Sequence, residues 1–167
     1  MKKIILFILF PLLSMGQTKI GADIDPEAAG DQSGFSVSLS KDGTTLAIGA
    51  PLNDGKGTGS GSVRVYKNVT GAWIQIGKDL DGEGAGDAMG WSVSLSNDGT
   101  TVAIGAPGFY GNGSSSGLVY VYKNVSGTWT RIGSGIYGEA AGYQVGSNVS
   151  LSSDGSIVAV GAPGYGI

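Results

Sequence analysis

The sequence predicts an all-β protein built from β-propeller blades, and three observations carry that prediction. A stretch of 18 residues occurs three times, as Gly34–Pro51, Gly90–Pro107 and Gly146–Pro163, and each copy has the pattern of a β-hairpin with an Asp-Gly turn. Glycine makes up 32 of the 167 residues while 41% of residues are apolar, which is typical of short strands joined by tight turns. The two faces of each hairpin differ in bulk, so copies of it can stack on one another with little void.

The N-terminal residues 1–16 have the pattern of a secretory signal peptide. Two lysines precede a ten-residue apolar region (4–13), and small residues stand before the expected cleavage site at Gln17. Ten apolar residues that include Pro11 are too few to span a membrane. We therefore expect a secreted or cell-surface protein with a short leader over 17–19 and no membrane span after cleavage.

The charge and composition of the remaining chain exclude several classes of function. Cleavage leaves 8 basic and 13 acidic residues, and this net charge of −5 disfavours binding to nucleic acid, which needs clustered Lys and Arg. The chain has no Cys and no His. Disulfides, Ser-His-Asp and Cys-His catalysis and the usual zinc sites are therefore excluded.

The chain repeats with a period of 56 residues and without insertions. Residues 20–75 and 76–131 are identical at 35 of 56 positions, and a partial third repeat, 132–167, ends just after its Gly-Ala-Pro. Propellers close with about 4–8 blades. We therefore expect two full blades and part of a third that belong to a larger propeller; self-association of several short chains into one ring is the alternative.

Each unit is predicted to form four short antiparallel strands. In the first unit the strands are expected at 35–40, 45–49, 63–67 and 72–76, with turns at 41–44 and 68–71 and a Gly-rich loop between the second and third strands. One face of the first hairpin carries Phe35, Val37, Leu39, Leu46 and Ile48, and the other carries serines and small residues. A β-solenoid is the rival architecture, but its coils are usually shorter than this unit.

The units resemble FG-GAP repeats, the blades of integrin α-chain propellers and of many bacterial surface proteins. The resemblance rests on Gly34, Gly90 and Gly146 before a Ser-Val-Ser-like strand, and on three Gly-Ala-Pro triplets that begin at Gly49, Gly105 and Gly161. It covers essentially the whole chain after the signal peptide. The Asp-Gly turn also resembles tryptophan–aspartate and TolB-like propellers, which would preserve the fold and change the family. The family's calcium loop would lie inside this hairpin, but each hairpin here holds a single acidic residue, so calcium is not carried over to it.

The densest carboxylates lie between the hairpins, where alternate acidic residues on an extended segment could present oxygens to Ca²⁺. The candidates are Asp23, Asp25, Glu27 and Asp31 in the first unit and Asp79, Asp81, Glu83 and Asp87 in the second. The third unit keeps only one of the four carboxylates. A solvated acidic loop whose Asp residues form turns is therefore the favoured interpretation.

Three further sets of residues have structural and functional interpretations. Asp42, Asp98 and Asp154 are explained as turn residues. Trp73 and Trp129, with Tyr66, Tyr120 and Tyr122, could form a platform that stacks on sugars, but packing of the tryptophans between blades is favoured. The Gly-rich loops 52–61 and 108–117 are the least repeated parts of the units, and variable loops on a constant scaffold tend to carry binding. A mobile connector is the favoured interpretation of each loop. From these loops the candidate binding residues are Asn53, Asp54, Phe109, Tyr110 and Asn112.

The sequence thus favours a non-catalytic secreted or cell-surface interaction or adhesion module without a cofactor. Its expected partner is a protein or glycan at the cell surface, with no nucleic acid. Two alternatives stay open: part of an extracellular enzyme whose catalytic residues lie outside this chain, and a calcium-dependent adhesion module.

Overall fold

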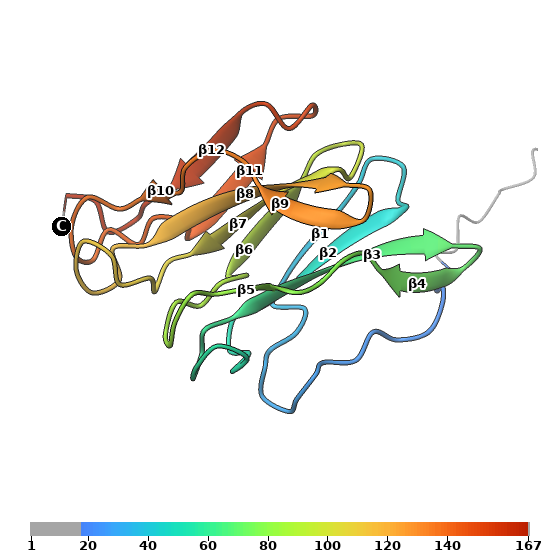
Figure 1. Cartoon of the computed structure of the whole chain (residues 1–167), viewed down its shortest axis with the longest axis horizontal. Coiled ribbons are helices and arrows are strands. Elements are labelled where there is room, and N and C mark those ends of the chain that lie inside the picture. The colour runs from blue at the N-terminus through green and yellow to red at the C-terminus, as the bar shows by residue number, and fades with distance from the viewer. Residues whose placement is uncertain (1–17, 167) are drawn as a thin grey trace, which may run out of the picture.

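The computed structural model describes residues 18–166, and these contain twelve strands and no helix (Figure 1). The signal-peptide prediction for residues 1–16 lies outside the described residues. No helix that is long and apolar enough to cross a membrane occurs within 18–166. The strands form two five-stranded sheets and one hairpin, and all of their pairings are antiparallel.

The first sheet contains the four strands expected for one blade. They are β1 (Ser36–Leu39), β2 (Thr45–Ala50), β3 (Ser62–Val69) and β4 (Ala72–Gln75), hydrogen-bonded in that order. The predicted positions are confirmed to within two residues. The β3–β4 turn is tighter than expected because only Thr70 and Gly71 form it, both with positive φ, as a two-residue hairpin turn requires.

A fifth strand, β5 (Leu80–Asp81), corrects the prediction of four-stranded blades. It pairs with Ser62 and Val63 at the start of β3, whereas β4 pairs only with Tyr66–Val69. The first residues of the eight-residue β3 are therefore not paired with β4. β5, which comes from the next unit, pairs with them and so covers this open edge.

The second sheet repeats the first. Its strands are β6 (Ser92–Leu95), β7 (Thr101–Ala106), β8 (Leu118–Val125) and β9 (Thr128–Arg131), with β10 (Ile136–Tyr137) on the start of β8. The third unit forms the hairpin of β11 (Asn148–Leu151) and β12 (Val158–Gly161). Figure 1 shows the three units side by side, with this hairpin at one end of the row.

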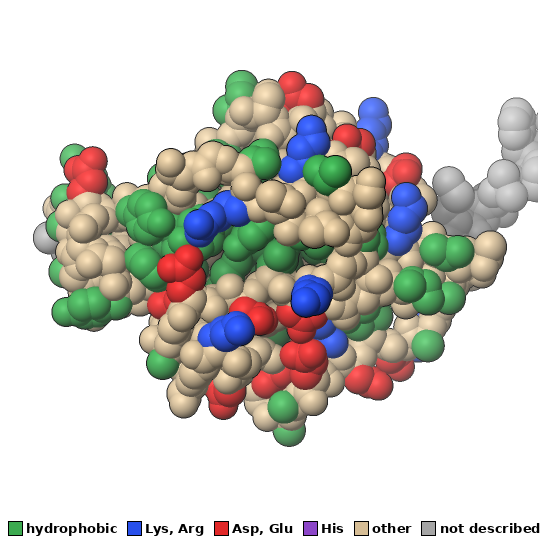
Figure 2. Space-filling model, in the orientation of Figure 1, with side chains coloured by type: hydrophobic (Ala, Val, Ile, Leu, Met, Phe, Trp, Pro, Cys, Tyr) green, Lys and Arg blue, Asp and Glu red, His purple; other side chains and the backbone are tan. Residues whose placement is uncertain are grey.

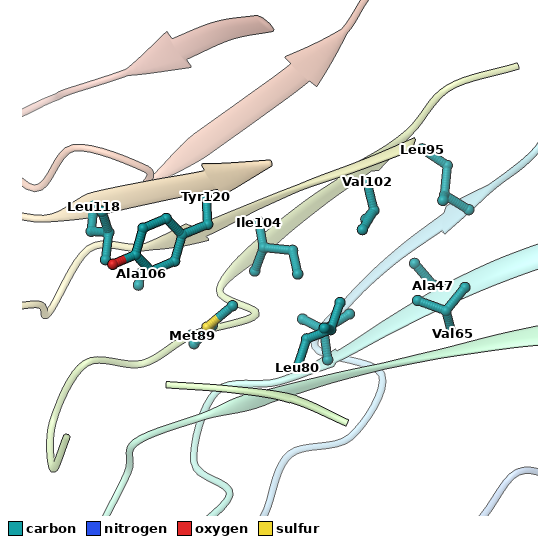
Figure 3. Packing of buried hydrophobic residues seen from close by; sticks show 11 residues of the cluster. Ala47, Val65, Leu80, Met89, Leu95, Val102, Ile104, Ala106, Leu118 and Tyr120 are labelled. Carbon is teal, nitrogen blue, oxygen red and sulfur yellow. The ribbon is translucent and has the colours of Figure 1, made fainter. Parts of the chain in front are cut away.

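The bulky face of one blade packs on the small face of its neighbour, which confirms the predicted mode of stacking. Leu95, Val102 and Ile104 of the second blade are buried against Ala47 and Val65 of the first. Leu80 and Met89, from the segment between the two sheets, complete this core (Figure 3). On the corresponding face of the first blade Ile48 is buried, but the innermost strand is open to solvent, since Val37 and Leu39 are 62% and 55% exposed.

The serines on the small face do more than leave room. Ser36 Oγ donates to the Gly90 carbonyl (2.7 Å), and Leu95 N donates to Ser38 Oγ (2.9 Å). The same pair of bonds joins Ser92 and Ser94 to the third unit. The serine hydroxyls thus provide hydrogen-bond partners for backbone groups in, or just before, the first strand of the next unit.

Each Asp-Gly turn is held by its own carboxylate. Asp42 Oδ1 accepts from Ser40 Oγ (2.6 Å) and Thr44 N (3.0 Å), and the same bonds recur at Asp98 and Asp154. The hydroxyl bond from Ser40, followed by the backbone bond from Thr44, lowers the pKa of Asp42 to about 2. The Asp154 pKa is lowered to about 2 in the same way, and that of Asp98 is also lowered. The structure therefore supports the interpretation of these residues as turn residues.

From the lowered pKa values in these turns we expect the folded protein to lose stability in acid. A carboxyl whose pKa is depressed in the folded state stabilises the fold above its unfolded value of about 3.8, and this contribution is lost as the pH falls towards 2. The midpoint of urea unfolding should therefore fall between pH 4 and pH 2. In the triple variant Asp42→Asn/Asp98→Asn/Asp154→Asn this fall should be smaller, whereas Glu139→Gln should leave it unchanged. An equally steep fall in the triple variant would contradict this assignment.

Candidate functional site: the loop end of the blades

The variable loops lie at one end of the blades. We call this end the loop end, and it comprises the loops 52–61 and 108–117 together with the segments 26–34, 82–90 and 138–146. Leu52 N donates to Asp31 O (3.2 Å) and Gly108 N to Asp87 O (3.1 Å). The first residue of each loop, directly after Gly-Ala-Pro, is therefore bonded to the loop-end segment of the same unit. The Asp-Gly turns and the β3–β4 and β8–β9 turns lie at the opposite end, where Asn68 N meets Thr44 O.

The last residues of each Gly-rich loop are bonded to the next unit. In loop 52–61, the carbonyls of Thr58, Gly59 and Ser60 accept from the amides of Gly86, Ala88 and Met89, at 2.9 to 3.0 Å. Loop 108–117 makes the same three bonds to the amides of Gly142, Gln144 and Val145. These bonds argue against the interpretation of the loops as mobile connectors.

The first loop places its two predicted binding residues differently. Asn53 is 6% exposed, and its amide donates to Glu27 Oε2 and Asp31 Oδ2, both at 3.0 Å, while its Oδ1 accepts from Gly55 N. All of the polar atoms of its side chain are therefore engaged in holding the loop. Asp54 is exposed and accepts from Gly59 N (2.8 Å), which leaves one carboxylate oxygen to solvent.

The second loop exposes one of its three predicted residues fully. Tyr110 is 72% exposed. Phe109 packs against the core, with its ring centroid 5.8 Å from that of Tyr137. Asn112 is exposed, but its amide donates to the Gly138 carbonyl (2.9 Å) of the next segment. Tyr110 and Asp54 are therefore the predicted residues that the fold leaves most available.

The four acidic residues of the first unit do not converge. Asp23 forms an exposed ion pair with Lys19 (2.6 Å), and Asp25 is fixed through its carbonyl, which accepts from Arg64 Nη2. Asp31 is buried and accepts from Ala28 N as well as from Asn53. Glu27 lies beside Asp79 of the second unit, and its pKa is raised by partial burial of the carboxyl and by that neighbouring charge.

The four acidic residues of the second unit are also engaged one by one. Asp87 is buried and accepts from Glu83 N and Gly84 N, and burial raises its pKa despite these bonds. Burial, followed by the charge of Asp79, raises the pKa of Asp81. Asp79 itself accepts from Gln75 Nε2 (2.5 Å).

The predicted calcium ligands are thus spread over separate contacts. Within residues 18–166, no three acidic side chains form a group that could hold a metal ion. Figure 2 shows acidic and basic side chains interspersed on the face in view. Asp31 and Asp87 act as turn residues at equivalent positions, as expected if these segments are acidic loops whose Asp residues form turns.

A tyrosine–carboxylate cluster at the outer edge of the second blade was not anticipated from the sequence. The hydroxyl of Tyr120 donates to Glu83 Oε1 (2.6 Å) and lies 3.2 Å from the hydroxyl of Tyr137. The Arg131 guanidinium lies 4.3 Å from the centre of the Tyr120 ring and 3.3 Å from the same Glu83 oxygen. Burial, followed by the bond to Glu83, raises the pKa of Tyr120, so the phenol stays protonated and serves as a donor. The sequence pointed to Tyr120 as an aromatic residue that could stack on sugars, and it shows that Tyr120 replaces Arg64 of the first unit.

The tryptophans of the fourth strands anchor the beginning of each unit. Trp73 Nε1 donates to the Ile20 carbonyl (3.1 Å) and Trp129 Nε1 to the Ile76 carbonyl (2.9 Å). Trp129 also packs against the core between the blades. These contacts support the packing interpretation rather than a sugar platform.

Three cavities open at the loop end. One of about 410 Å³ is lined by residues 28–31 and by loop residues that include Leu52 and Asp54. A second, of about 200 Å³, lies beside Trp91 and is lined by Ser115 and Gln144, among others. A third, of about 240 Å³, is lined by residues of the segment 138–146 and by Tyr165. The loop end therefore offers concave surface. Cavities of about 340 and 280 Å³ also lie away from it, beside Trp129 and beside Gly155.

Antiparallel sheets that stack face to face, with loops gathered at one end, define the chain as a protein of β-propeller blades. The model of a family described as "FG-GAP repeat" matches residues 17–66 and 79–122. The chain belongs to the FG-GAP repeat family.

Solved structures give a likeness of fold alone. A structure titled "Complex of KlAtg21 with coiled-coil of AgAtg16" aligns with a TM-score of 0.51 and 15% identity over 76% of this chain and 36% of that chain. A second, "Kuenenia stuttgartiensis Hydrazine Synthase", aligns with a TM-score of 0.46 and 20% identity over 74% and 28%. The chain thus spans 36% or less of the length of either protein.

Proposed function

We propose that this chain is a non-catalytic interaction or adhesion module that acts outside the cell or at its surface, and that it binds its partner at the loop end. The observation that carries the proposal is the contrast between the two ends of the blades. The sheets, the Asp-Gly turns and the serine bonds repeat almost unchanged, whereas the loops 52–61 and 108–117 differ between units. A constant scaffold that presents variable, well-bonded loops is the usual arrangement of a binding protein.

The chemistry of the loop end supports binding rather than catalysis. The two buried carboxylates there, Asp31 and Asp87, are committed to backbone amides. The groups left available are exposed aromatic and amide side chains, such as Tyr110 and Gln144, which suit the surface of a protein or a glycan. No cofactor is part of the proposal.

Replacement of the loops tests the proposal. Labelled protein is applied to arrays of extracellular proteins and of surface polysaccharides, with either Ca²⁺ or EDTA in the buffer. We expect at least one class of target to retain the wild-type chain, and retention to fall at least tenfold, roughly 1.4 kcal/mol, when 52–61 and 108–117 are replaced by Gly/Ser segments of equal length.

The control changes the opposite end of the blades. Thr70→Asn and Ser126→Asn alter the hairpin turns, where asparagine tolerates the left-handed conformation, and they should leave retention unchanged. Retention that survives loop replacement, or that is lost in the turn variants, would refute the loop end as the binding face. Retention that requires Ca²⁺ would favour the calcium-dependent module instead.

A further inference from the structure

The cavity of about 200 Å³ beside Trp91 exists because one aromatic residue of the repeat is missing. Phe35, Trp91 and Ser147 occupy the same position in the three units, directly after the glycine that precedes the first strand. The rings of Phe35 and Trp91 contact each other across the first pair of units, with centroids 4.7 Å apart and planes at 50°. At the next step Ser147 replaces the aromatic ring, so the space beside Trp91 stays open.

The backbone around this cavity is held in an uncommon conformation. Three non-glycine residues that line the cavity have positive φ: Ala88 (56°), Ser115 (51°) and Gln144 (55°). Ala88 and Gln144 share their position in the repeat with Gln32 (56°), so their conformation belongs to the scaffold. Ser115 stands where the first unit has Gly59, which adopts this conformation without steric cost (φ 62°). A non-glycine residue in the left-handed conformation costs free energy, and at Ser115 this cost is particular to the second of the two loops.

The lining of the cavity combines an aromatic ring with uncharged polar groups. Trp91 is 41% exposed, and no lining residue carries a charge. Gln144 is bonded through its backbone, since its N donates to Ser115 O (3.0 Å) and its O accepts from Ser147 Oγ (2.8 Å). Its side-chain amide is exposed and offers two donors and an acceptor beside the cavity.

We propose that this cavity binds a neutral sugar ring of a glycan, with the ring packed against Trp91 and its hydroxyls bonded to Gln144 and Ser115. The apolar C–H face of a pyranose complements the negative face of an indole, and its hydroxyls both donate and accept, as an amide and a hydroxyl require. The absence of charge in the lining selects against phosphate and carboxylate ligands. The volume is below the 300 to 1,000 Å³ of sites for drug-sized ligands, which suits a single ring of a chain that continues into solvent. The proposal rests on the proposed function in taking the loop end as the binding face.

Calorimetry and tryptophan fluorescence with defined oligosaccharides test this site. The probes are maltohexaose, cellohexaose and chitohexaose, with hexagalacturonate as the charged comparison. We expect at least one neutral probe to bind with a Kd on the order of 1 mM and to change the fluorescence. Trp91→Ala should weaken this binding at least tenfold, and so should Ser147→Trp, which fills the cavity with the residue that the second unit carries at this position.

Trp73→Phe, on an outer strand, is the matched control and should leave the affinity within twofold. The proposal is overturned if no neutral probe binds at about 10 mM, if hexagalacturonate binds best, or if Ser147→Trp binds as the wild type does. Ser147→Trp leaves the loops 52–61 and 108–117 unaltered. If retention on the arrays depends on these loops but persists in Ser147→Trp, the proposed function is upheld and the sugar site is refuted.

Discussion

Replacing Leu95 with alanine is expected to lower the free energy of unfolding by about 3 kcal/mol, because the side chain is 8% exposed and lies in the core between two blades. Removing it leaves a cavity between the sheets, which are held apart by the other residues of the bulky face and cannot close around the gap. Urea titration followed by fluorescence of the tryptophans measures the loss.

The repeat supplies the control for this prediction. Leu39 is the same residue at the same position of the first unit, but it is 55% exposed on the open face of the stack. Leu39→Ala should therefore lower the free energy of unfolding by less than about 1 kcal/mol, because the leucine side chain buries little apolar area in the folded state. Equal losses for the two variants would mean that the blades do not stack through this face in solution.

Gly105→Ala is expected to cost about 3 kcal/mol for the opposite reason, because it adds an atom where the backbones of two units meet. A Cβ at this position would collide with the Gly146 carbonyl and with Ser92 Oγ, which are hydrogen-bonded to each other across the interface. Neither group can retreat without breaking that bond. The melting temperature and the urea midpoint should both fall.

Gly84→Ala is the matched control for this prediction. A Cβ there has open space within 4 Å, and its amide keeps its bond to Asp87. The variant should be neutral or slightly stabilised, since alanine restricts the unfolded chain. If Gly105→Ala were as stable as Gly84→Ala, the glycine of Gly-Ala-Pro would have no packing role.

The two stability predictions bear on function because the loop end depends on the stack. Loop 52–61 of the first unit is bonded to segment 82–90 of the second, and the Trp91 cavity is built from the second and third units. Neither surface exists on an isolated blade. A variant that separates the blades should therefore lose binding even though its loops are unchanged.

Local patterns were sufficient to predict the strands and turns. Alternation placed β1 and β2, and the Asp-Gly pair placed the turn between them, because both depend on residues close together in the chain. The same patterns missed β5 and β10, two-residue strands that form only because the starts of β3 and β8 lack a partner. Their pairing depends on an edge that another unit leaves open.

The candidate site was predicted less completely than the fold. Loop variability indicated the loop end, but Asn53 is buried there by two carboxylates of a distant segment, which no loop sequence reveals. Trp91 stands where the first unit has Phe35, and its cavity depends on Ser147, 56 residues away. A residue's availability depends on what packs over it, and that is a property of neighbours in space.

The sequence by itself determined the repeat, the blade-forming hairpins, the contrast between bulky and small faces, and the family, since all of these follow from the order of side chains along the chain. Only the tertiary structure decided which of three equivalent faces is buried, how the eight carboxylates separate into individual contacts, and where a cavity remains. Identical positions such as Leu39 and Leu95 differ in burial because burial depends on the adjacent unit. The repeated hairpin specifies the scaffold, and its neighbours decide what each copy can do.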